Sequence, residues 1–155
     1  MVQVLVLYYS RTGNTEALAN AVADGSRQVK DVLAVVRRID SATVQDLISC
    51  DAVAFGSPNY FGYMAGLMKD FFDKAWSARS NVTGKIAVAF TSGGGGSNAA
   101  LVSIENMIGS FKLDKVAEGV ASSGKPSDQD VKKCKDLGRE LAETAISRMK
   151  ETPKA

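Results

Sequence analysis

Residues 1–25, MVQVLVLYYSRTGNTEALANAVADG, contain the pattern that decides the fold. A nearly continuous apolar run, Val2 to Tyr8, leads through a loop of hydroxyl residues and glycine into a segment of helical spacing. We expect the helix to begin near Gly13 and to end near Gly25, since glycine suits the left-handed position that closes many helices. A buried strand passing directly into a helix is the opening unit of an α/β domain.

The same alternation continues along the chain. Further apolar runs predict strands at Val32 to Arg38, Ala52 to Gly56, Lys85 to Phe90 and Lys115 to Gly119. Segments of helical spacing predict helices at Val44 to Ile48, Met64 to Ser77, Asn98 to Ile108 and onward from Pro126, where Ser127 and Asp130 form a capping pattern. Apolar strands between helices indicate a parallel sheet buried on both faces. We predict one three-layer α/β domain over residues 1–150 and a frayed tail over residues 151–155.

Composition excludes several classes of function. The 155 residues include 19 basic and 17 acidic side chains with no basic block, so nucleic acid is not an expected partner. No run approaches the roughly 20 apolar residues that a membrane span requires, and Met1 leads directly into a strand. We therefore expect no membrane span and a cytoplasmic location.

Nucleophilic and metal chemistry find little support. The sequence has no histidine, so it offers neither a Ser-His nor a Cys-His pair. Cys50 and Cys134 are far apart, outside any CxxC pattern, which predicts two buried free thiols rather than a disulfide framework or a metal site.

The loop after the first strand has the chemistry of an anion site. The first N–H groups of a helix lack partners, and the helix dipole adds positive character there. Hydroxyl groups supply further donors, and glycine lets the backbone approach a ligand. The candidate phosphate-binding residues are Ser10, Arg11, Thr12, Gly13, Asn14 and Thr15. A capped helix with a polar first turn is the simpler alternative.

The loop after the third predicted strand is rich in aromatic residues. Large rings favour burial, whereas loops run over the surface, so a planar ligand would explain three aromatic residues in one glycine-containing loop. Packing of the loop on its own rings is the alternative. The candidate ligand-binding residues are Ser57, Pro58, Asn59, Tyr60, Phe61 and Gly62, followed by Tyr63.

A third loop, between the fourth strand and the next helix, exposes bare backbone through four glycines. Its candidate ligand-binding residues are Thr91, Ser92, Gly93, Gly94 and Gly95. A flexible linker is the alternative, although a linker is unexpected between two core elements.

These loops together resemble two related families. The spacing S-x-T-G-x-T resembles the phosphate loop of flavodoxins, while the stretch from Gly56 to Asp73 is similar to flavodoxins and to NAD(P)H:quinone oxidoreductases of the tryptophan-repressor-binding-protein type. The resemblance implies flavin mononucleotide (FMN) as cofactor and a five-stranded, doubly wound sheet of order 2-1-3-4-5. Flavodoxins hold FMN at the switch between the first and third strands, so this placement follows from resemblance alone. It also implies that Trp76, the only tryptophan, borders the flavin; a core position is the alternative.

Other uses of this architecture do not fit the loops. A receiver domain requires acidic residues where Tyr9-Ser10 and Ser57-Pro58 stand, and a low-molecular-weight phosphatase requires a cysteine in the first loop. Dinucleotide binding of the Rossmann type requires G-x-G-x-x-G in a loop that has one glycine.

Two activities remain. One is an electron carrier that cycles FMN among oxidised, semiquinone and hydroquinone states with redox partner proteins, namely a reductase or ferredoxin-like donor and an acceptor enzyme. The other is an FMN-dependent NAD(P)H:quinone oxidoreductase. The chain lacks room for the extra segments of the oxidoreductase and has no histidine, so the carrier is the favoured interpretation.

Overall fold

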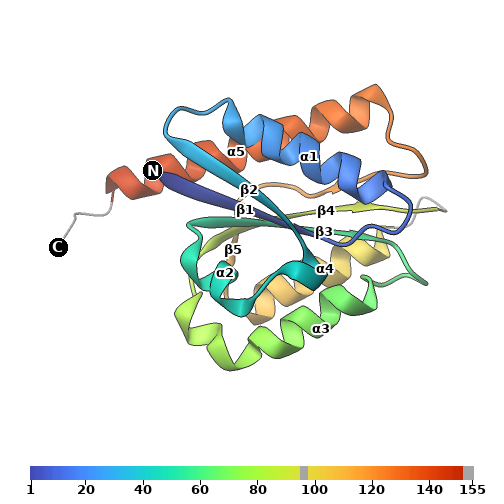
Figure 1. Ribbon diagram of the computed structural model, residues 1–155, viewed down its shortest axis with the longest axis horizontal. Coiled ribbons are helices and arrows are strands. Elements are labelled where there is room, and N and C mark those ends of the chain that lie inside the picture. Colours follow the sequence, from blue (N-terminus) through green and yellow to red (C-terminus); the bar gives the residue numbers. More distant parts are fainter. Residues whose placement is uncertain (95–97, 152–155) are drawn as a thin grey trace.

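A parallel sheet lies between two layers of helices in the computed structural model, which describes residues 1–94 and 98–151 (Figure 1). The strands follow the order β2-β1-β3-β4-β5, and β6 also pairs with β4. Helices α1 and α5 cover one face of the sheet, while α3 and α4 cover the other. The predicted three-layer, doubly wound α/β fold and its strand order are confirmed.

The elements have the following bounds. The strands are β1 (Val2–Tyr8), β2 (Val32–Arg38), β3 (Ala52–Pro58), β4 (Ile86–Ser92), β5 (Asp114–Lys115) and β6 (Val120–Ala121). The helices are α1 (Asn14–Arg27), α2 (Val44–Ser49), α3 (Gly66–Ala75), α4 (Ala99–Ser110) and α5 (Asp128–Glu151), with 3₁₀ turns η1 (Ile39–Ser41) and η2 (Trp76–Asn81).

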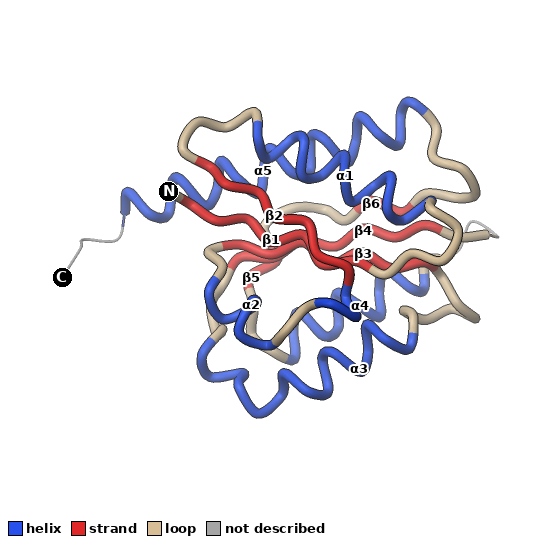
Figure 2. The backbone as a smooth tube through the Cα atoms, in the orientation of Figure 1, coloured by secondary structure: helices blue, strands red, loops and turns tan. Residues whose placement is uncertain are grey.

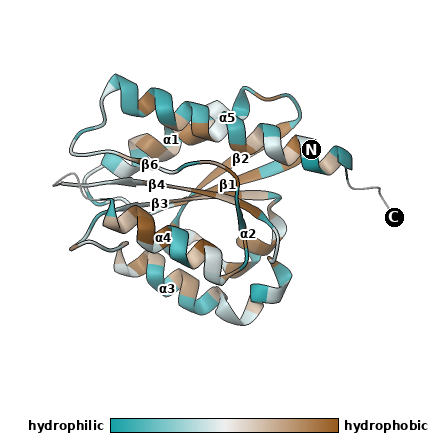
Figure 3. Cartoon of the chain, turned by 180° about the vertical axis from the view of Figure 1, so that it is seen from behind, coloured by the Kyte–Doolittle hydropathy of each residue, from teal (hydrophilic) through white to brown (hydrophobic). Residues whose placement is uncertain are grey.

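The central strands are apolar on both faces because helices cover both. Val4 and Val6 of β1 pack in the layer under α1 and α5, whereas Leu5 and Leu7 pack in the layer above α3 and α4. This alternation follows from the two-residue period of a strand. Figure 3 shows brown strands between helices whose outer surfaces carry most of the teal, polar residues.

Helix α1 ends at Arg27, two residues past the expected end near Gly25, and Gly25 is not the left-handed glycine that was expected to close it. Gly25 instead lets α1 approach α5, because an added Cβ would lie 1.9 Å from the carbonyl oxygen of Lys135. Gly138 on α5 has the reciprocal role, with an added Cβ 1.9 Å from the carbonyl oxygen of Val22. The Ser26 hydroxyl then donates to the Gly138 carbonyl at 2.9 Å across this contact.

The predicted fifth strand over Lys115 to Gly119 is also wrong in its bounds. Two short segments, β5 and β6, pair with the start and the end of β4 instead. The chain takes five steps from Lys115 to Val120 while β4 takes three from Ala87 to Phe90, so two residues bulge out of the ladder.

The remaining helices agree with the pattern, with shifts at their ends. The predicted capping pattern of α5 is present, since the Ser127 hydroxyl accepts from the Asp130 N–H and the Asp130 carboxylate accepts from the Ser127 N–H. Glu151 is the last residue of α5, and the rest of the predicted tail, 152–155, lies outside the described residues. Within the part of the chain that the structure describes, no helix has the length and apolarity needed to cross a bilayer.

Candidate functional site

A cleft of about 430 Å³ opens at the carboxyl edge of the sheet. The loops after β1, β3 and β4 come together at this edge (Figure 2). This volume is within the roughly 300–1,000 Å³ of small-molecule sites. The three predicted loops are thus brought together. The cleft is lined by Arg11, Thr12, Asn14, Thr15, Pro58, Asn59, Tyr60, Ser92, Gly93, Gly94 and Gly124.

The first loop prepares the amino end of α1 for an anion. The buried Ser10 hydroxyl accepts a hydrogen bond from the Gly13 N–H at 3.1 Å and so closes the loop as a tight turn. Gly13, with φ of 98°, precedes the helix and has no side chain to cap the next N–H groups. These donors, with the exposed Arg11 and Thr12 beside them, are available to an anionic ligand.

Arg38, at the end of β2, holds the first loop in place. The sequence analysis did not identify this role. One guanidinium nitrogen donates to the Ser10 carbonyl oxygen at 2.6 Å, and the guanidinium lies 4.9 Å from the centre of the Tyr9 ring. A hydrogen bond to Asp40 raises the pKa of Arg38, so the side chain keeps its charge. The Tyr9 ring in turn meets Tyr60 of the second loop edge to face, at 6.4 Å between centres.

The second loop ends in a two-residue turn. The N–H groups of Tyr60 and Tyr63 donate to each other's carbonyl oxygens, at 2.9 and 3.1 Å. Between them, Phe61 and Gly62 have φ values of 56° and 80°, the signs of a type I′ hairpin turn. The Asn59 side-chain oxygen accepts from the Gly62 N–H at 2.9 Å, while the Phe61 ring is fully exposed at the tip.

Ser57 lies beneath this loop rather than in the cleft. Its buried hydroxyl donates to the Pro58 carbonyl oxygen and accepts from the Ala65 N–H, both at 2.8 Å. The side chain therefore joins the end of β3 to the start of α3. Pro58 lines the cleft itself.

The third loop is joined to both of the others. The Ser92 hydroxyl lies 2.6 Å from the Thr15 hydroxyl of α1, and the Ser92 carbonyl oxygen accepts from the Asn59 N–H at 2.7 Å. Gly93, with φ of 146°, has no room for a side chain, since an added Cβ would lie 2.7 Å from the Asn59 Cβ. Thr91 is buried and Gly94 is exposed, whereas the predicted site residue Gly95 lies outside the described residues.

A fourth loop, after β6, completes the cleft and was missed by the sequence analysis. The Gly124 N–H donates to the Gly93 carbonyl oxygen at 2.8 Å, and the Ser122 N–H donates to the Thr91 carbonyl oxygen at 2.9 Å. The available signal was the turn composition Ser-Ser-Gly-Lys-Pro over residues 122–126, a short distance after the predicted strand that ends at Gly119.

Trp76, which the family resemblance implied would border the flavin, is not brought to the cleft. It follows α3 in the 3₁₀ turn η2, where its ring meets Phe111 at 5.2 Å between centres and lies under the Arg79 guanidinium at 4.4 Å. Because α3 runs antiparallel to the strands, its last residue is at the amino edge of the sheet, opposite the four loops (Figure 1).

Arg11 is the one charged side chain among the described residues that line the cleft. The nearby Glu16 carboxylate accepts a hydrogen bond from the Tyr8 hydroxyl at 2.8 Å. Burial first, and then this bond, raise the pKa of Tyr8. The side chains that line the cleft are therefore cationic or neutral, and the Glu16 carboxylate lies nearby in the first turn of α1.

The cysteines take no part in the cleft. Both are buried free thiols, as predicted, and burial raises the pKa of Cys50 to about 11 and that of Cys134 to about 12. A thiol with such a pKa remains protonated at neutral pH and is a poor nucleophile.

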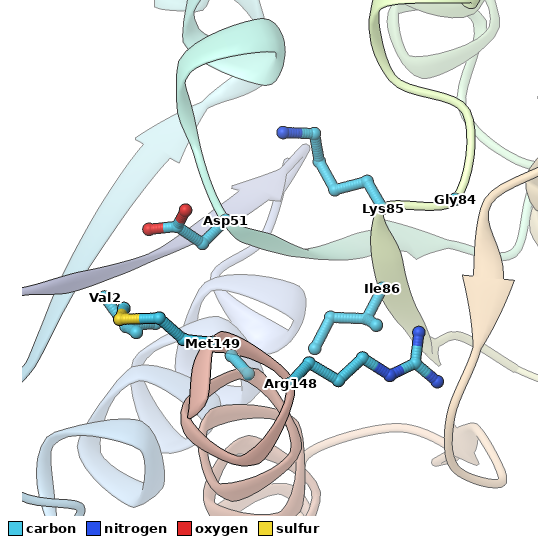
Figure 4. Close-up of a pocket in the computed structure, with 8 residues that line it drawn as sticks. Val2, Asp51, Gly84, Lys85, Ile86, Arg148 and Met149 are labelled. Carbon is cyan, nitrogen blue, oxygen red and sulfur yellow. The ribbon is translucent and has the colours of Figure 1, made fainter. Parts of the chain in front are cut away.

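A second cavity, of about 240 Å³, lies at the opposite, amino edge of the sheet (Figure 4). The charged side chains that line it are engaged within the fold. Lys85 donates to the carbonyl oxygens of Ile48 and Cys50, Arg148 pairs with Asp114, and Asp51 accepts from the Gln3 N–H. We assign it no ligand.

Comparison with known proteins shows which family the chain belongs to. The family described as "Flavodoxin" matches residues 6–138. A flavodoxin from Aquifex aeolicus (strain VF5) is 36% identical over 163 aligned positions, covering 92% of this chain and 86% of the relative. An NAD(P)H dehydrogenase (quinone) from Caulobacter vibrioides (strain NA1000 / CB15N) is 33% identical over 196 positions, covering 94% of this chain and 98% of the relative.

A solved structure of a flavodoxin has a similar fold. A flavodoxin from the domain Archaea superposes with a TM-score of 0.86 and 30% sequence identity, covering 94% of this chain and 99% of the other. With the family match spanning most of its length, the chain belongs to the flavodoxin family.

Proposed function

We propose that this protein binds FMN in the carboxyl-edge cleft and serves as an electron carrier. The observation that carries the proposal is that three separately predicted loops meet in one cleft, at the amino end of α1. Bound FMN can accept and return electrons singly or in pairs, and the chain's own groups set how readily it does so.

The donor set around α1 fits a phosphate. Free N–H groups of the first helical turn, the hydroxyls of Thr12 and Thr15, and the Arg11 cation surround the same end of the cleft. Backbone donors and hydroxyls can hold a phosphate without a lysine. We assign the phosphate to this end.

The other end of the cleft fits a flat heterocycle. Tyr60 supplies a ring face, and Asn59, Gly93 and Gly94 supply backbone and amide groups. Gly93 cannot carry a side chain without displacing Asn59, which keeps this wall bare. Exposed peptide groups suit the polar edge of a flavin, and aromatic stacking stabilises such rings by roughly 1–3 kcal/mol, a scale taken from nucleic-acid bases.

The carrier is favoured over the quinone oxidoreductase because the chain lacks segments that the quinone dehydrogenase relative has. Alignment to the quinone dehydrogenase extends over 196 positions, whereas alignment to the flavodoxin extends over 163, for a chain of 155 residues. The dehydrogenase therefore has segments without counterparts here. The fourth loop is also short, since β6 ends at Ala121 and α5 begins at Asp128.

A carrier needs partners rather than a substrate pocket. We expect a reductase or ferredoxin-like donor and an acceptor enzyme to meet the protein at the open cleft. The exposed Phe61 tip and the half-buried Tyr60 lie at this edge and are available for contact.

The experiment is a binding titration of the apoprotein with FMN, followed by quenching of flavin fluorescence. We expect saturable 1:1 binding that Gly93→Ala abolishes or strongly weakens, because the new Cβ collides with Asn59. Gly84→Ala is the matched control: Gly84 also has positive φ, 84°, but lies before β4 at the amino edge with open space around it. Absence of binding by the wild type, or equal losses in both variants, would contradict the proposal.

A further inference from the structure

Two small hydroxyl side chains are in contact at the phosphate end of the cleft, and a third follows the neighbouring strand β6. Thr15 and Ser92 are buried, and their hydroxyl oxygens lie 2.6 Å apart. Ser122, at the end of β6, is more than nine-tenths buried, and its hydroxyl has no hydrogen-bond partner among the described residues.

The register of the sheet places Ser122 beside Ser92. The parallel pairs of β4 and β6 are Phe90 with Val120 and Thr91 with Ala121, so one further step along both strands places Ser122 next to Ser92. The Ser122 N–H donates to the Thr91 carbonyl oxygen, as this register requires. Phe90 and Val120 both pack in the core under α1 and α5. Two residues further on, alternation returns both serine side chains to that face. In-register neighbours are about 4.8 Å apart along the hydrogen-bonding direction, a spacing at which side-chain rotation can bring two serine hydroxyls within bonding distance.

A buried hydroxyl without a partner is costly, which calls for an explanation. A hydroxyl has one proton to donate and two lone pairs that accept. If Thr15 donates its proton to an anion above α1, it can only accept from Ser92. Ser92 then gives its own proton to Thr15 and retains acceptor capacity for one more donor, and Ser122 is the unpaired donor beside it.

We propose that Ser122 is a positioning residue for the phosphate of the bound flavin nucleotide. Its hydroxyl donates to Ser92, Ser92 donates to Thr15, and Thr15 thereby presents its proton to the phosphate. The inference rests on the proposed function, and it extends that function to a residue that does not line the cleft. Each of the three hydroxyls donates its proton toward the phosphate. The phosphate fixes this order because an anion can only accept the last hydrogen bond.

The test compares the affinities of wild type and variants for FMN and for riboflavin, which has the same ring without the phosphate. We expect Ser122→Ala to weaken FMN binding by about threefold to tenfold, the size of one net hydrogen bond, and to leave riboflavin binding unchanged. Ser123→Ala, at the exposed neighbouring position, is the matched control and should change neither. Ser122→Thr keeps the hydroxyl and should restore FMN binding.

Two further measurements separate positioning from a structural role. Ser122→Ala should not lower the free energy of unfolding of the apoprotein, because it removes a hydroxyl that is unpaired there. Ser92→Ala should lose FMN affinity as well, and the double variant should lose no more than Ser92→Ala alone, since Ser122 acts through Ser92.

The outcomes are distinct. A wild type that binds neither flavin overturns the proposed function. A wild type that binds FMN, with Ser122→Ala binding it equally well, overturns the positioning role alone. Equal losses for FMN and riboflavin also overturn it, because the effect would then not concern the phosphate.

Discussion

One guanidinium nitrogen of Arg38 lies 2.6 Å from the carbonyl oxygen of Ser10, across 28 positions of sequence. The bond joins the end of β2 to the loop that precedes α1. Since the same guanidinium covers the Tyr9 ring, one side chain fixes both the backbone and the aromatic flank of the anion site.

Arg38→Gln should therefore weaken FMN binding by about tenfold or more, because a charged hydrogen bond contributes roughly 1.5–3 kcal/mol. Arg37→Gln is the matched control, with the same loss of charge one residue earlier. Arg37 is exposed and makes only a 3.8 Å ion pair with Asp46. Fluorescence titration measures both. Similar losses of FMN affinity in the two variants would mean that the overall positive charge, and not the bond from Arg38 to Ser10, supports the loop.

The turn at Phe61–Gly62 should control the one-electron-reduced form of the flavin. Gly62 has positive φ, so this peptide can rotate once the hydrogen bond from the Gly62 N–H to the Asn59 side chain breaks, and it then offers the Phe61 carbonyl oxygen to the reduced ring. Gly62→Ala should lower the yield of the one-electron form in a redox titration. Gly66→Ala, in open space at the start of α3, should not. An unchanged yield in Gly62→Ala would reject the role of this peptide.

The charge of the cleft should set the second reduction potential. Arg11 is the one charged residue among the described residues lining the cleft, so an added electron meets no carboxylate there. We expect a less negative second potential than in a cleft with acidic walls. Arg11→Glu should lower it by on the order of tens of millivolts. Lys30→Glu, before β2 at the far edge, changes net charge equally and should have little effect; an equal shift would point to net charge alone.

The contact between α1 and α5 should tolerate no added methyl group. Gly138→Ala should lower the free energy of unfolding by about 1–3 kcal/mol, because the Cβ would meet the Val22 carbonyl oxygen at 1.9 Å. Gly109→Ala, also within a helix but in open space, should raise it by about 0.5–1 kcal/mol. Urea denaturation of the apoproteins measures both free energies of unfolding. A Gly138→Ala variant as stable as the wild type would contradict the close approach of α1 and α5.

Local patterns predicted most of the fold and three of the four loops. Strand and helix periods, the glycine and hydroxyl residues after β1, and the capping pattern of Ser127 all depend on near neighbours, so sequence records them. Gly25 shows what local sequence cannot decide. A helix end and a close helix contact both require glycine, and only the position of Lys135 distinguishes them.

The site residues that were missed depend on tertiary position. Arg38 belongs to the site because β2 pairs with β1, and Ser122 because β6 pairs with the end of β4. Neither relation leaves a mark on nearby sequence. Trp76 is the opposite case, since the family resemblance implied a place beside the flavin, whereas the direction of α3 puts it at the other edge of the sheet.

The central claim, that the protein carries electrons on FMN and does not oxidise nicotinamides, is tested most directly by anaerobic titration of the FMN-reconstituted protein. Dithionite and NADH or NADPH are added in separate experiments while the visible spectrum is followed. We predict that dithionite passes through a long-wavelength one-electron form and that neither nicotinamide reduces the flavin. Direct two-electron bleaching by NADH or NADPH, with colour restored by a quinone, would contradict the carrier and identify a quinone oxidoreductase.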